Sequence, residues 1–383
     1  METYDCLVVA ESRFAGGSTA ALVTDVTAMS ELGLSIGLLF VRSAYLDDSR
    51  DAPNPKALEL ADLPGVTMLS PSRPARGRLA FLHHPLVFVR GIEERAHLSA
   101  DRSVIVAHHP PFRPDGSVEY NPMEAIRRAR AALGLSAWIA PVSGLVRTQI
   151  AAFAPFVRQT SIDWPNVFDI SDWTMTRPPF SGGGPVTIGR HGRPDRLKFP
   201  ATGPEIDACL PACPELRVRV LGCPTAALAQ DGAHPEHWDI VAFGGEPVSD
   251  FLNSLDVFVY HHHPRINEAF GRTVVEAGLC GRPLLLDPRL RPTFGDMAVY
   301  CSPGEVRDCV LRIASDPDAA RAGASEVRRR MATLYASGSI GPRLDQIAAD
   351  GGATSRREAG VSLPMLARKL GGHYRRRLLG GTG

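Results

Sequence analysis

Short apolar runs alternate with stretches of helical periodicity along most of this chain of 383 residues, and the alternation stops once and then restarts. The first series opens with an apolar run at residues 6–10 and a helical stretch at 19–32. The second series opens with an apolar run at 186–189. Strands that alternate with helices are typical of parallel, doubly wound sheets. The sequence therefore predicts an α/β protein made of two similar domains.

The interruption between the two series, residues 163–185, is rich in proline, glycine and aromatic residues. This composition is typical of a linker. We therefore place the first domain at residues 1–180 and the second at 181–345. Residues 346–383 form a tail in which most charged side chains are arginine or lysine. A solvated, partly disordered tail is the simplest expectation, and contact with an anionic membrane surface is the alternative.

The same periodicity predicts further elements in both halves. In the first half we expect strands at 35–41, 66–69, 79–82, 103–107 and 137–142, and helices at 90–98 and 123–133. In the second half we expect strands at 217–222, 240–243, 256–260 and 284–286, and helices at 248–255, 306–316 and 319–334. Ligands of such sheets bind where the carboxyl ends of the strands meet.

Composition and charge exclude several function classes. A formal net charge of +1 argues against a general nucleic-acid binder. No apolar run reaches the ~18–20 residues of a membrane span, and the first residues lack the basic start and apolar length of a signal peptide. We therefore expect a cytoplasmic protein. The seven cysteines contain no CxxC pair, so we expect reduced, structural thiols.

The segment at 267–277 has a phenylalanine–glycine pair between two glutamates, and it follows the expected strand at 256–260. This order suits a loop that turns into a helix. Gly271 allows a ligand to approach the backbone closely. The free amides at the start of the helix, near Arg272 and Thr273, can face a phosphate. The segment therefore predicts an anion site at a helix start.

The two glutamates, Glu268 and Glu276, flank that helix start. Glu268 would lie on one side of the phosphate and Glu276 on the other, with their carboxylates on the order of 10 Å apart. A nucleotide diphosphate sugar has hydroxyls at both ends, on the sugar and on the ribose, with the diphosphate between them. The spacing suits such a molecule, and an amphipathic helix with two solvated glutamates is the alternative.

The paired glutamates, the Phe–Gly between them and the turn and strand at 281–286 resemble the donor-binding motif of retaining GT-B glycosyltransferases of family 4. The resemblance implies two Rossmann-like domains that face each other across a cleft, with the acceptor on the first domain and the nucleotide sugar on the second. It implies that Glu276 binds the ribose and that a C-terminal helix crosses back to the first domain. It further implies donor contacts from Glu268 and from Ala269, Phe270, Gly271, Arg272 and Thr273.

A basic loop follows the expected strand at 186–189. Arginine offers phosphate a planar fork and lysine offers a point charge, and both stay charged near neutral pH. The loop resembles the Gly-Arg…Lys element of the family, which implies that Arg190 and Lys198 hold the diphosphate. The gap between them is longer than is usual in the family, so Arg193 or Arg196 can share the role. A solvated basic loop is the alternative.

The first domain offers a glycine loop and two histidine pairs. Gly16 and Gly17 follow the first strand, where a glycine loop can approach a diphosphate, although GxGxxG is absent and an ordinary tight turn is the alternative. His84 and His109 each follow a strand, so they lie at the carboxyl edge. The resemblance implies a histidine close to the transferred sugar. His84 matches that place best, and His109 is the second candidate.

Two features of the second domain complete the set of candidates. Phe243 ends the expected strand at 240–243, and the resemblance implies that backbone groups at this edge meet the nucleotide base. The run 261–263 is all histidine, which raises the possibility of a metal, but adjacent loop residues do not easily point at one ion. The resemblance implies no obligatory metal, and we expect no cofactor.

The resemblance therefore predicts a retaining glycosyltransferase of the hexosyltransferase type. It would move a sugar from a UDP- or GDP-sugar to a hydroxyl of a glycan, glycolipid or small molecule. Polysaccharide biosynthesis, in the cytoplasm or at the inner face of the membrane, is the expected setting. A GT-B epimerase or phosphorylase and a catalytically inactive nucleotide-sugar-binding protein are the alternatives. A dehydrogenase would need the dinucleotide loop that Gly16 and Gly17 do not supply.

Overall fold

The computed structural model describes residues 1–14, 16–46, 52–352 and 361–379. The chain divides into two compact units: unit 1 comprises Met1–Phe168 and Ser337–Gly383, and unit 2 comprises Asp169–Ala336. The predicted boundaries at residues 180 and 345 are therefore displaced. The segment after Phe168 packs on unit 2, where Arg177 forms an ion pair of 2.9 Å with Asp256. The chain returns to unit 1 at Ser337, whose amide donates to Phe168 O at 2.9 Å.

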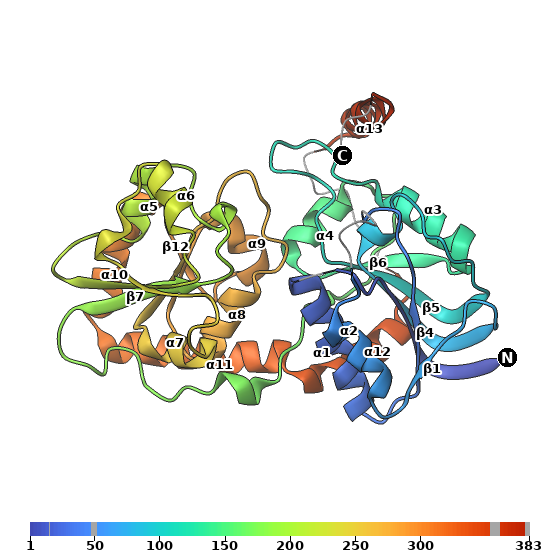
Figure 1. The fold of residues 1–383 in the computed structure, drawn as a ribbon, viewed down its shortest axis with the longest axis horizontal. Helices are drawn as coiled ribbons and strands as arrows, with labels where there is room; N and C mark the ends of the chain where they lie inside the picture. The colour runs from blue at the N-terminus through green and yellow to red at the C-terminus, as the bar shows by residue number, and fades with distance from the viewer. Residues whose placement is uncertain (15, 47–51, 353–360, 380–383) are drawn as a thin grey trace. The chain divides into compact units, whose positions relative to one another are not determined.

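Unit 1 contains a parallel six-stranded sheet with the order β3-β2-β1-β4-β5-β6 (Figure 1). Its central strand β1 is buried from Cys6 to Ala10, as expected for a strand covered on both faces. The strands are β1 (Glu2–Ala10), β2 (Ile36–Phe40), β3 (Val66–Met68), β4 (Ala75–His83), β5 (Leu98–Ala107) and β6 (Ala137–Pro141).

The helices of unit 1 cover this sheet. Helix α12 contacts α1 and the strands β4 and β5, whereas α3 and α4 contact β6. The helices are α1 (Gly17–Glu31), α2 (Pro55–Leu58), α3 (Pro122–Leu133), α4 (Gly144–Ala151), α12 (Ile340–Ala349) and α13 (Leu363–Leu378), and the short 3₁₀ helices are η1 (Glu59–Asp62) and η2 (Pro85–Val87).

Unit 2 contains a second parallel six-stranded sheet, with the order β12-β11-β10-β7-β8-β9. The strands are β7 (Val186–His191), β8 (Leu216–Leu221), β9 (Asp239–Val241), β10 (Val257–Tyr260), β11 (Leu284–Leu286) and β12 (Val299–Tyr300). Read from its other end, this order is β9-β8-β7-β10-β11-β12, which is the same topology as in unit 1. In both sheets the first three strands lie on one side and the last three on the other.

Helices cover both faces of the sheet in unit 2 (Figure 1). Ile206 of α5 and Val306 and Val310 of α10 share one apolar core with Ile188 and Val259 of the strands. Helices α8 and α11 contact each other. The helices are α5 (Gly203–Cys209), α6 (Thr225–Gln230), α7 (Val248–Ser254), α8 (Arg272–Leu279), α9 (Arg291–Phe294), α10 (Val306–Ala314) and α11 (Pro317–Tyr335). The short 3₁₀ helices are η3 (Ile170–Trp173), η4 (Arg196–Lys198), η5 (Pro235–His237), η6 (Pro288–Leu290) and η7 (Pro303–Glu305), with η8 (Ser337–Ser339) where the chain re-enters unit 1.

The predicted helix at 90–98 is wrong. Residues 90–97 contain neither helix nor strand, and β5 already begins at Leu98. Tertiary pairing overrides the local periodicity, because Ile92 pairs with Ser43 in an antiparallel bridge and Ala44 N donates to Gly91 O at 3.1 Å. The segment 90–93 therefore runs beside the loop after β2.

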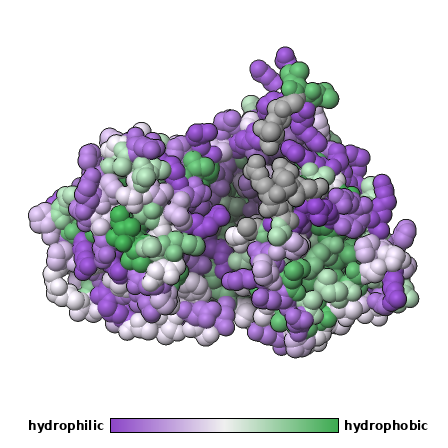
Figure 2. Space-filling view, in the orientation of Figure 1, coloured by the Kyte–Doolittle hydropathy of each residue, from purple (hydrophilic) through white to green (hydrophobic). Residues whose placement is uncertain are grey.

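The basic tail is partly helical. Residues 363–378 form α13, while 353–360 and 380–383 lie outside the described residues. Leu366 and His373 of α13 are buried, whereas Met365 and Leu378 are exposed. At the position that α13 has in Figure 1, Figure 2 shows hydrophobic side chains next to hydrophilic ones. The helix is therefore amphipathic and docks one face on unit 1.

Candidate functional site

The strand order of unit 2 reverses between β7 and β10, which are hydrogen-bonded neighbours. The chain runs from β7 to β8 and β9 on one side and from β10 to β11 and β12 on the other. Open α/β sheets bind ligands at the carboxyl ends of the strands beside such a reversal. The residues at these ends are Arg190 and His191 on β7 and Tyr260 and His261 on and after β10.

Arg190 is buried at this point and joins the two strand ends. Its Nη1 donates to His261 O at 2.8 Å, and its Nη2 donates to Lys198 O. The guanidinium carbon lies 4.1 Å from the ring centroid of Phe199 and 4.7 Å from that of Tyr260. Burial lowers the pKa of Arg190. The side chain therefore fixes the basic loop against β10.

Lys198 and Glu268 form an ion pair beside Tyr260. Lys198 Nζ lies 2.5 Å from Glu268 Oε2, and Tyr260 Oη donates to the same oxygen at 2.7 Å. Burial alone would raise the pKa of Glu268, but the charge of Lys198 and the hydrogen bonds from Lys198 and Tyr260 outweigh it, so the pKa is lowered. Glu268 is thus held as a carboxylate next to an ammonium group.

The other two arginines of the basic loop differ in role. Arg196 donates to Pro200 O at 2.6 Å and to Ala201 O at 2.7 Å, and it pairs with Asp231. It therefore holds the chain on its way into α5. Arg193 is exposed. Of the two arginines expected to share the diphosphate role, Arg196 is therefore already engaged by Asp231 and these carbonyls.

Gly271 begins helix α8 with a φ of +85°, a conformation that glycine adopts without strain. A Cβ there would lie 3.6 Å from Glu268 Cγ, so the glutamate borders the helix start. Val274 N and Val275 N both donate to Gly271 O, at 3.0 and 3.3 Å. The amides of Arg272 and Thr273 precede these two, and amides at this place in a helix have no hydrogen-bond partner within the helix.

The residues around Gly271 take different positions. Phe270 is buried and meets the ring of Tyr335 edge-on, with centroids 5.5 Å apart, so its side chain anchors the loop. Ala269 is half-buried. Thr273 Oγ1 is buried and has no hydrogen-bond partner among the described residues.

Glu276 lies one turn further along α8 and faces the end of β7. Its Oε2 is 3.2 Å from His191 Nε2, and its Oε1 is 3.9 Å from Arg272 Nε. His191 is itself buried, and its Nε2 lacks the geometry of a hydrogen bond. The second glutamate therefore reaches the end of β7, the strand that also carries Arg190.

Phe243 follows β9, and its ring is 60% exposed. A Cβ on Gly222, after β8, would lie 3.3 Å from Phe243 Cδ2 and 1.9 Å from Gly192 O, after β7. The loops after β7, β8 and β9 thus touch, and Gly222 must be glycine for this approach. An exposed aromatic ring at this edge offers a stacking surface.

In unit 1, the strand order reverses between β1 and β4, and the glycine loop and His84 lie at that reversal. Gly16 has a φ of +74° and precedes α1, which begins at Gly17. His84 stacks on Phe14 of the same loop, with ring centroids 4.8 Å apart. The glycine loop and the predicted histidine are therefore in contact.

The histidines of unit 1 form one cluster. The centroids of His84 and His109 are 6.2 Å apart, and His108 Nε2 lies 3.3 Å from His83 Nδ1. Burial lowers the pKa of His84 well below its usual value, and nearby histidines lower it further. His84 Nδ1 accepts from Leu86 N at 3.2 Å, so the neutral ring carries its proton on Nε2. His84 can donate a hydrogen bond from that atom.

The structure brings the predicted residues into two groups. In unit 2, Arg190, Lys198 and Glu268 are linked by direct contacts, and the start of α8 and Glu276 adjoin them. In unit 1, Gly16 and Gly17 lie with His84 and His109. Sequence reasoning missed Tyr260 and His191. Tyr260 stands in the last position of the expected strand at 256–260, whereas His191 stands in the basic loop expected after the strand at 186–189. Their place at a strand end is the one signal that marked them.

The described residues contain no metal cluster, membrane-spanning helix or disulfide. Within the described ranges, no group of three or more histidine, cysteine, aspartate or glutamate side chains suits a metal ion, and this includes the histidines at 261–263. No helix in the same part of the chain has the length and apolar character of a membrane span. All seven cysteines are free thiols.

Comparison with known proteins identifies structural relatives only. No protein-family model matches the chain, and no curated protein sequence matches it significantly. The structure of HepE from Anabaena in complex with UDP aligns with a TM-score of 0.62 at 14% identity, over 91% of this chain and 100% of that chain. Sucrose-phosphate synthase from Thermosynechococcus elongatus gives 0.58 at 14%, over 91% and 98%. A glycosyltransferase from Rickettsia africae gives 0.60 at 10%, over 91% and 97%.

These likenesses and the two parallel six-stranded sheets show the fold. The chain has the α/β architecture of GT-B glycosyltransferases, and the predicted α/β class with two Rossmann-like domains is confirmed.

Proposed function

We propose that this protein is a glycosyltransferase that moves a sugar from a nucleotide diphosphate donor to a hydroxyl acceptor. The observation that carries the proposal is the Lys198–Glu268 ion pair beside the first turn of α8, at the strand-order reversal of unit 2. A cation and helix-start amides suit a diphosphate, and a carboxylate suits sugar hydroxyls. The GT-B relatives support this assignment, and the HepE structure contains UDP.

The donor would lie along the carboxyl edge of unit 2. Lys198 and the amides of Arg272 and Thr273 would bind the diphosphate, with Glu268 on the sugar and Glu276 on the ribose. The exposed ring of Phe243 would stack on the base, in addition to the backbone contacts expected there. Arg190 would act on the diphosphate through its hold on the basic loop, because its Nη atoms already bind the carbonyls of His261 and Lys198.

Departure of the diphosphate places negative charge at the start of α8. A fixed ammonium group and helix amides stabilise that charge without reorganisation. We propose retention of configuration by front-face substitution, in which the departing phosphate oxygen helps to take the proton of the acceptor hydroxyl. Glu268 would orient the sugar and support the positive charge that develops on it. No obligatory metal is part of this proposal.

The acceptor would bind on unit 1, where His84 can donate a hydrogen bond from Nε2. His109, in the same cluster, would support it. The acceptor class is a glycan, a glycolipid or a small molecule, and a hexose from a UDP- or GDP-sugar is the proposed donor group. Contact of the basic tail with the inner face of a membrane is part of the same proposal for lipid acceptors.

A calorimetric titration against UDP, GDP, ADP and TDP tests the donor site. The variant Lys198→Ala should weaken binding of the preferred nucleotide about 10- to 100-fold, because it removes a charge-assisted contact. Arg217→Gln, at the amino end of β8, is the matched control and should bind as the wild type does. Binding of none of the four nucleotides, or equal binding by Lys198→Ala, would contradict the proposal.

Turnover separates the related functions. Glu268→Gln should bind the nucleotide but lower the rate of nucleotide release from the donor sugar by about 10²–10³-fold. Release that requires an added acceptor identifies transfer, whereas conversion of the donor without acceptor identifies an epimerase. A protein that binds the nucleotide sugar but does not convert it, with or without an acceptor, is the inactive binding protein.

A further inference from the structure

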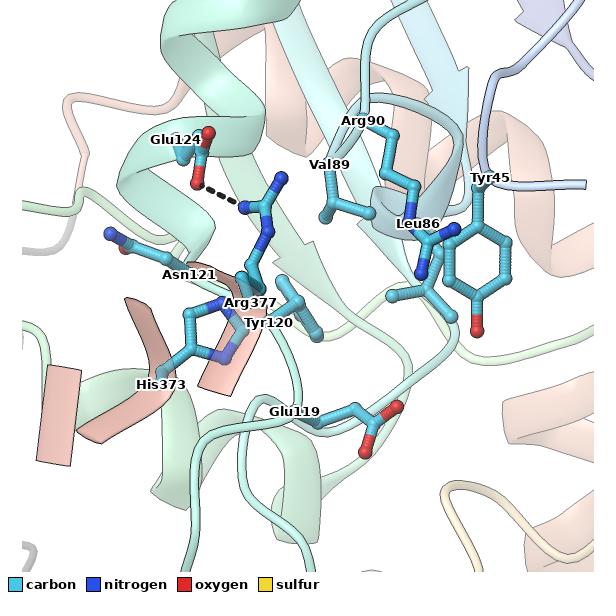
Figure 3. A pocket seen from close by; sticks show the side chains of 10 residues that line it. All are labelled: Tyr45, Leu86, Val89, Arg90, Glu119, Tyr120, Asn121, Glu124, His373 and Arg377. Carbon is cyan, nitrogen blue, oxygen red and sulfur yellow. Dashed lines mark hydrogen bonds and ion pairs between the residues drawn. The ribbon is translucent and has the colours of Figure 1, made fainter. Parts of the chain in front are cut away.

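A pocket on unit 1 lies outside the residues assigned above (Figure 3). Its empty volume is about 380 Å³, part of which is open to solvent. Tyr45 follows β2, Leu86 and Arg90 follow β4, and Glu119 and Asn121 follow β5, while His373 and Arg377 come from α13. The pocket therefore lies at the carboxyl edge of the sheet, where α/β units bind ligands.

The pocket shares its wall with the histidine cluster. Leu86 donates its amide to His84 Nδ1 at 3.2 Å, and Tyr120, another lining residue, donates its hydroxyl to His109 O at 3.0 Å. A ligand in the pocket would therefore lie next to the side chains that we propose for the acceptor hydroxyl.

Helix α13 closes one side of the pocket through polar contacts. Arg377 Nη1 lies 3.1 Å from Glu124 Oε2, and His373 Nδ1 lies 3.2 Å from Val118 O. Tyr374 Oη accepts from Asn121 Nδ2 at 2.8 Å. The basic tail thus builds part of a pocket, which the sequence did not indicate.

The charged lining of the pocket is balanced, with Arg90 and Arg377 against Glu119 and Glu124. Glu119 pairs with Arg113, and Glu124 pairs with Arg128 at 2.7 Å as well as with Arg377. Both glutamates are therefore neutralised by neighbours.

Arg90 takes no part in the ion pairs of Glu119 and Glu124. It is exposed and lies over the ring of Tyr45, 5.6 Å from its centroid, and it forms no ion pair with any described residue. Figure 3 shows Arg90 and Tyr45 on one side of the pocket and Arg377 and His373 on the other.

We propose that this pocket binds a phosphate group of the acceptor, with Arg90 and Arg377 as its cations. Arginine forks match phosphate oxygens in pairs. The carboxylate of Glu119 can accept hydrogen bonds from neighbouring hydroxyls of the same ligand, and the hydroxyl of Tyr45 can donate or accept them. That the ligand is the acceptor rests on the proposed function, whereas the phosphate site itself does not. The phosphate belongs to a soluble phosphorylated sugar or polyol or to a lipid headgroup, which share this chemistry.

Titration with glycerol 3-phosphate tests the site directly, with glycerol as the neutral probe. The wild type should bind glycerol 3-phosphate and not glycerol, and Arg90→Gln should weaken binding at least about tenfold. Arg90 is exposed, so this change leaves folding intact. Arg368→Gln is the matched control, because Arg368 is an exposed arginine on α13 that does not line the pocket. It should bind as the wild type does.

Arg377→Gln should also weaken binding, but it loosens α13 as well because it breaks the pair with Glu124. Tyr374→Phe serves as its check, since it removes contacts that dock α13 but no charge. If both changes weaken binding equally, docking of the helix is sufficient to explain Arg377, and the role of Arg377 as a phosphate cation is overturned. A larger effect of Arg377→Gln supports that role.

Vesicles distinguish the two sources of the phosphate. Binding to phosphatidylglycerol vesicles that falls in Arg90→Gln, with none to phosphatidylcholine vesicles, assigns the site to a lipid headgroup. Binding of glycerol 3-phosphate without vesicle binding assigns it to a soluble phosphate. Vesicle binding that Arg90→Gln leaves unchanged counts against a headgroup in the pocket.

The same samples are titrated with UDP, GDP, ADP and TDP. If one of these nucleotides binds and glycerol 3-phosphate does not, or binds Arg90→Gln as tightly as the wild type, the pocket proposal is overturned and the donor site stands. If glycerol 3-phosphate binds in an Arg90-dependent way and no nucleotide binds, the phosphate site stands and the proposed function fails.

Discussion

Glu268 is a carboxylate that two neighbouring donors keep charged. Its Oε2 accepts hydrogen bonds from Lys198 Nζ at 2.5 Å and from Tyr260 Oη at 2.7 Å. A buried carboxylate without such partners would take up a proton. The two donors keep it charged, and the carboxylate in turn holds Lys198 at the place where a diphosphate would need it.

The pH dependence of stability should report this arrangement. The folded-state pKa of Glu268 is lowered, so its stabilising contribution is fully present above the ordinary glutamate value of about 4.3 and is lost as pH falls through the folded-state value. Lys198→Met should remove about 1–3 kcal/mol of unfolding free energy at pH 7 and less below pH 4, because the buried carboxylate loses its cation. Urea unfolding at several pH values measures the difference.

Tyr260→Phe is the matched comparison for that series. It removes one hydrogen bond to the same oxygen and leaves the ion pair, so the loss should be about 1 kcal/mol. A loss in Lys198→Met that does not change between pH 7 and pH 4 would show that the lysine contributes packing alone and that Glu268 does not depend on its charge.

At the scale of the elements, the start of α8 depends on one backbone conformation. Gly271→Ala should lower the unfolding free energy by about 1–2 kcal/mol, because the φ of +85° is strained for any residue with a Cβ. The added Cβ would also meet the ring of Phe294 at 3.3 Å. Gly304→Ala is the control, because a Cβ there meets nothing within 4 Å. Equal losses in the two variants would contradict the special role of Gly271.

Helix α13 is held to unit 1 by one apolar side chain as well as by its polar contacts. Leu366 is 2% exposed, whereas Leu378 near the end of the same helix is 87% exposed. Leu366→Ala should release the helix, since truncation of a buried leucine costs about 2–5 kcal/mol. Trypsin should then cleave faster at the arginines of α13, with Leu378→Ala as the control. Equal cleavage rates would mean that the polar contacts alone dock the helix.

At the scale of the whole molecule, most strands could be predicted because their signal is local, whereas the two-residue strand β12 was missed. The apolar runs that became β1, β10 and β11 are continuous and buried, as parallel strands require. The helix wrongly predicted at 90–98 failed for the opposite reason. Ile92 pairs with Ser43, a partner about fifty positions away in the chain that periodicity does not see.

The candidate site could be predicted only as residue types at strand ends. Glu268 and Lys198 were recognisable from their segments, but their mutual contact was not, because it spans two loops that β7 and β10 bring together. Tyr260 was missed because it stands in an apolar run, and His191 was missed because it stands among the basic residues of the loop after 186–189. The change of unit after Phe168 was missed because Arg177 binds Asp256, which no feature of the linker composition indicates.

Hydrogen exchange on the whole chain can test where a nucleotide binds. UDP at about 100 times its dissociation constant stabilises the bound state by about 2.7 kcal/mol, so the slowest-exchanging amides that it covers should be protected up to about 100-fold. We expect protection at 186–199 and 266–277 in unit 2 and little change at β1 of unit 1. Lys198→Ala at the same UDP concentration should lose most of this protection. Protection confined to unit 1, or its absence at 266–277, would contradict the assignment of the diphosphate to α8.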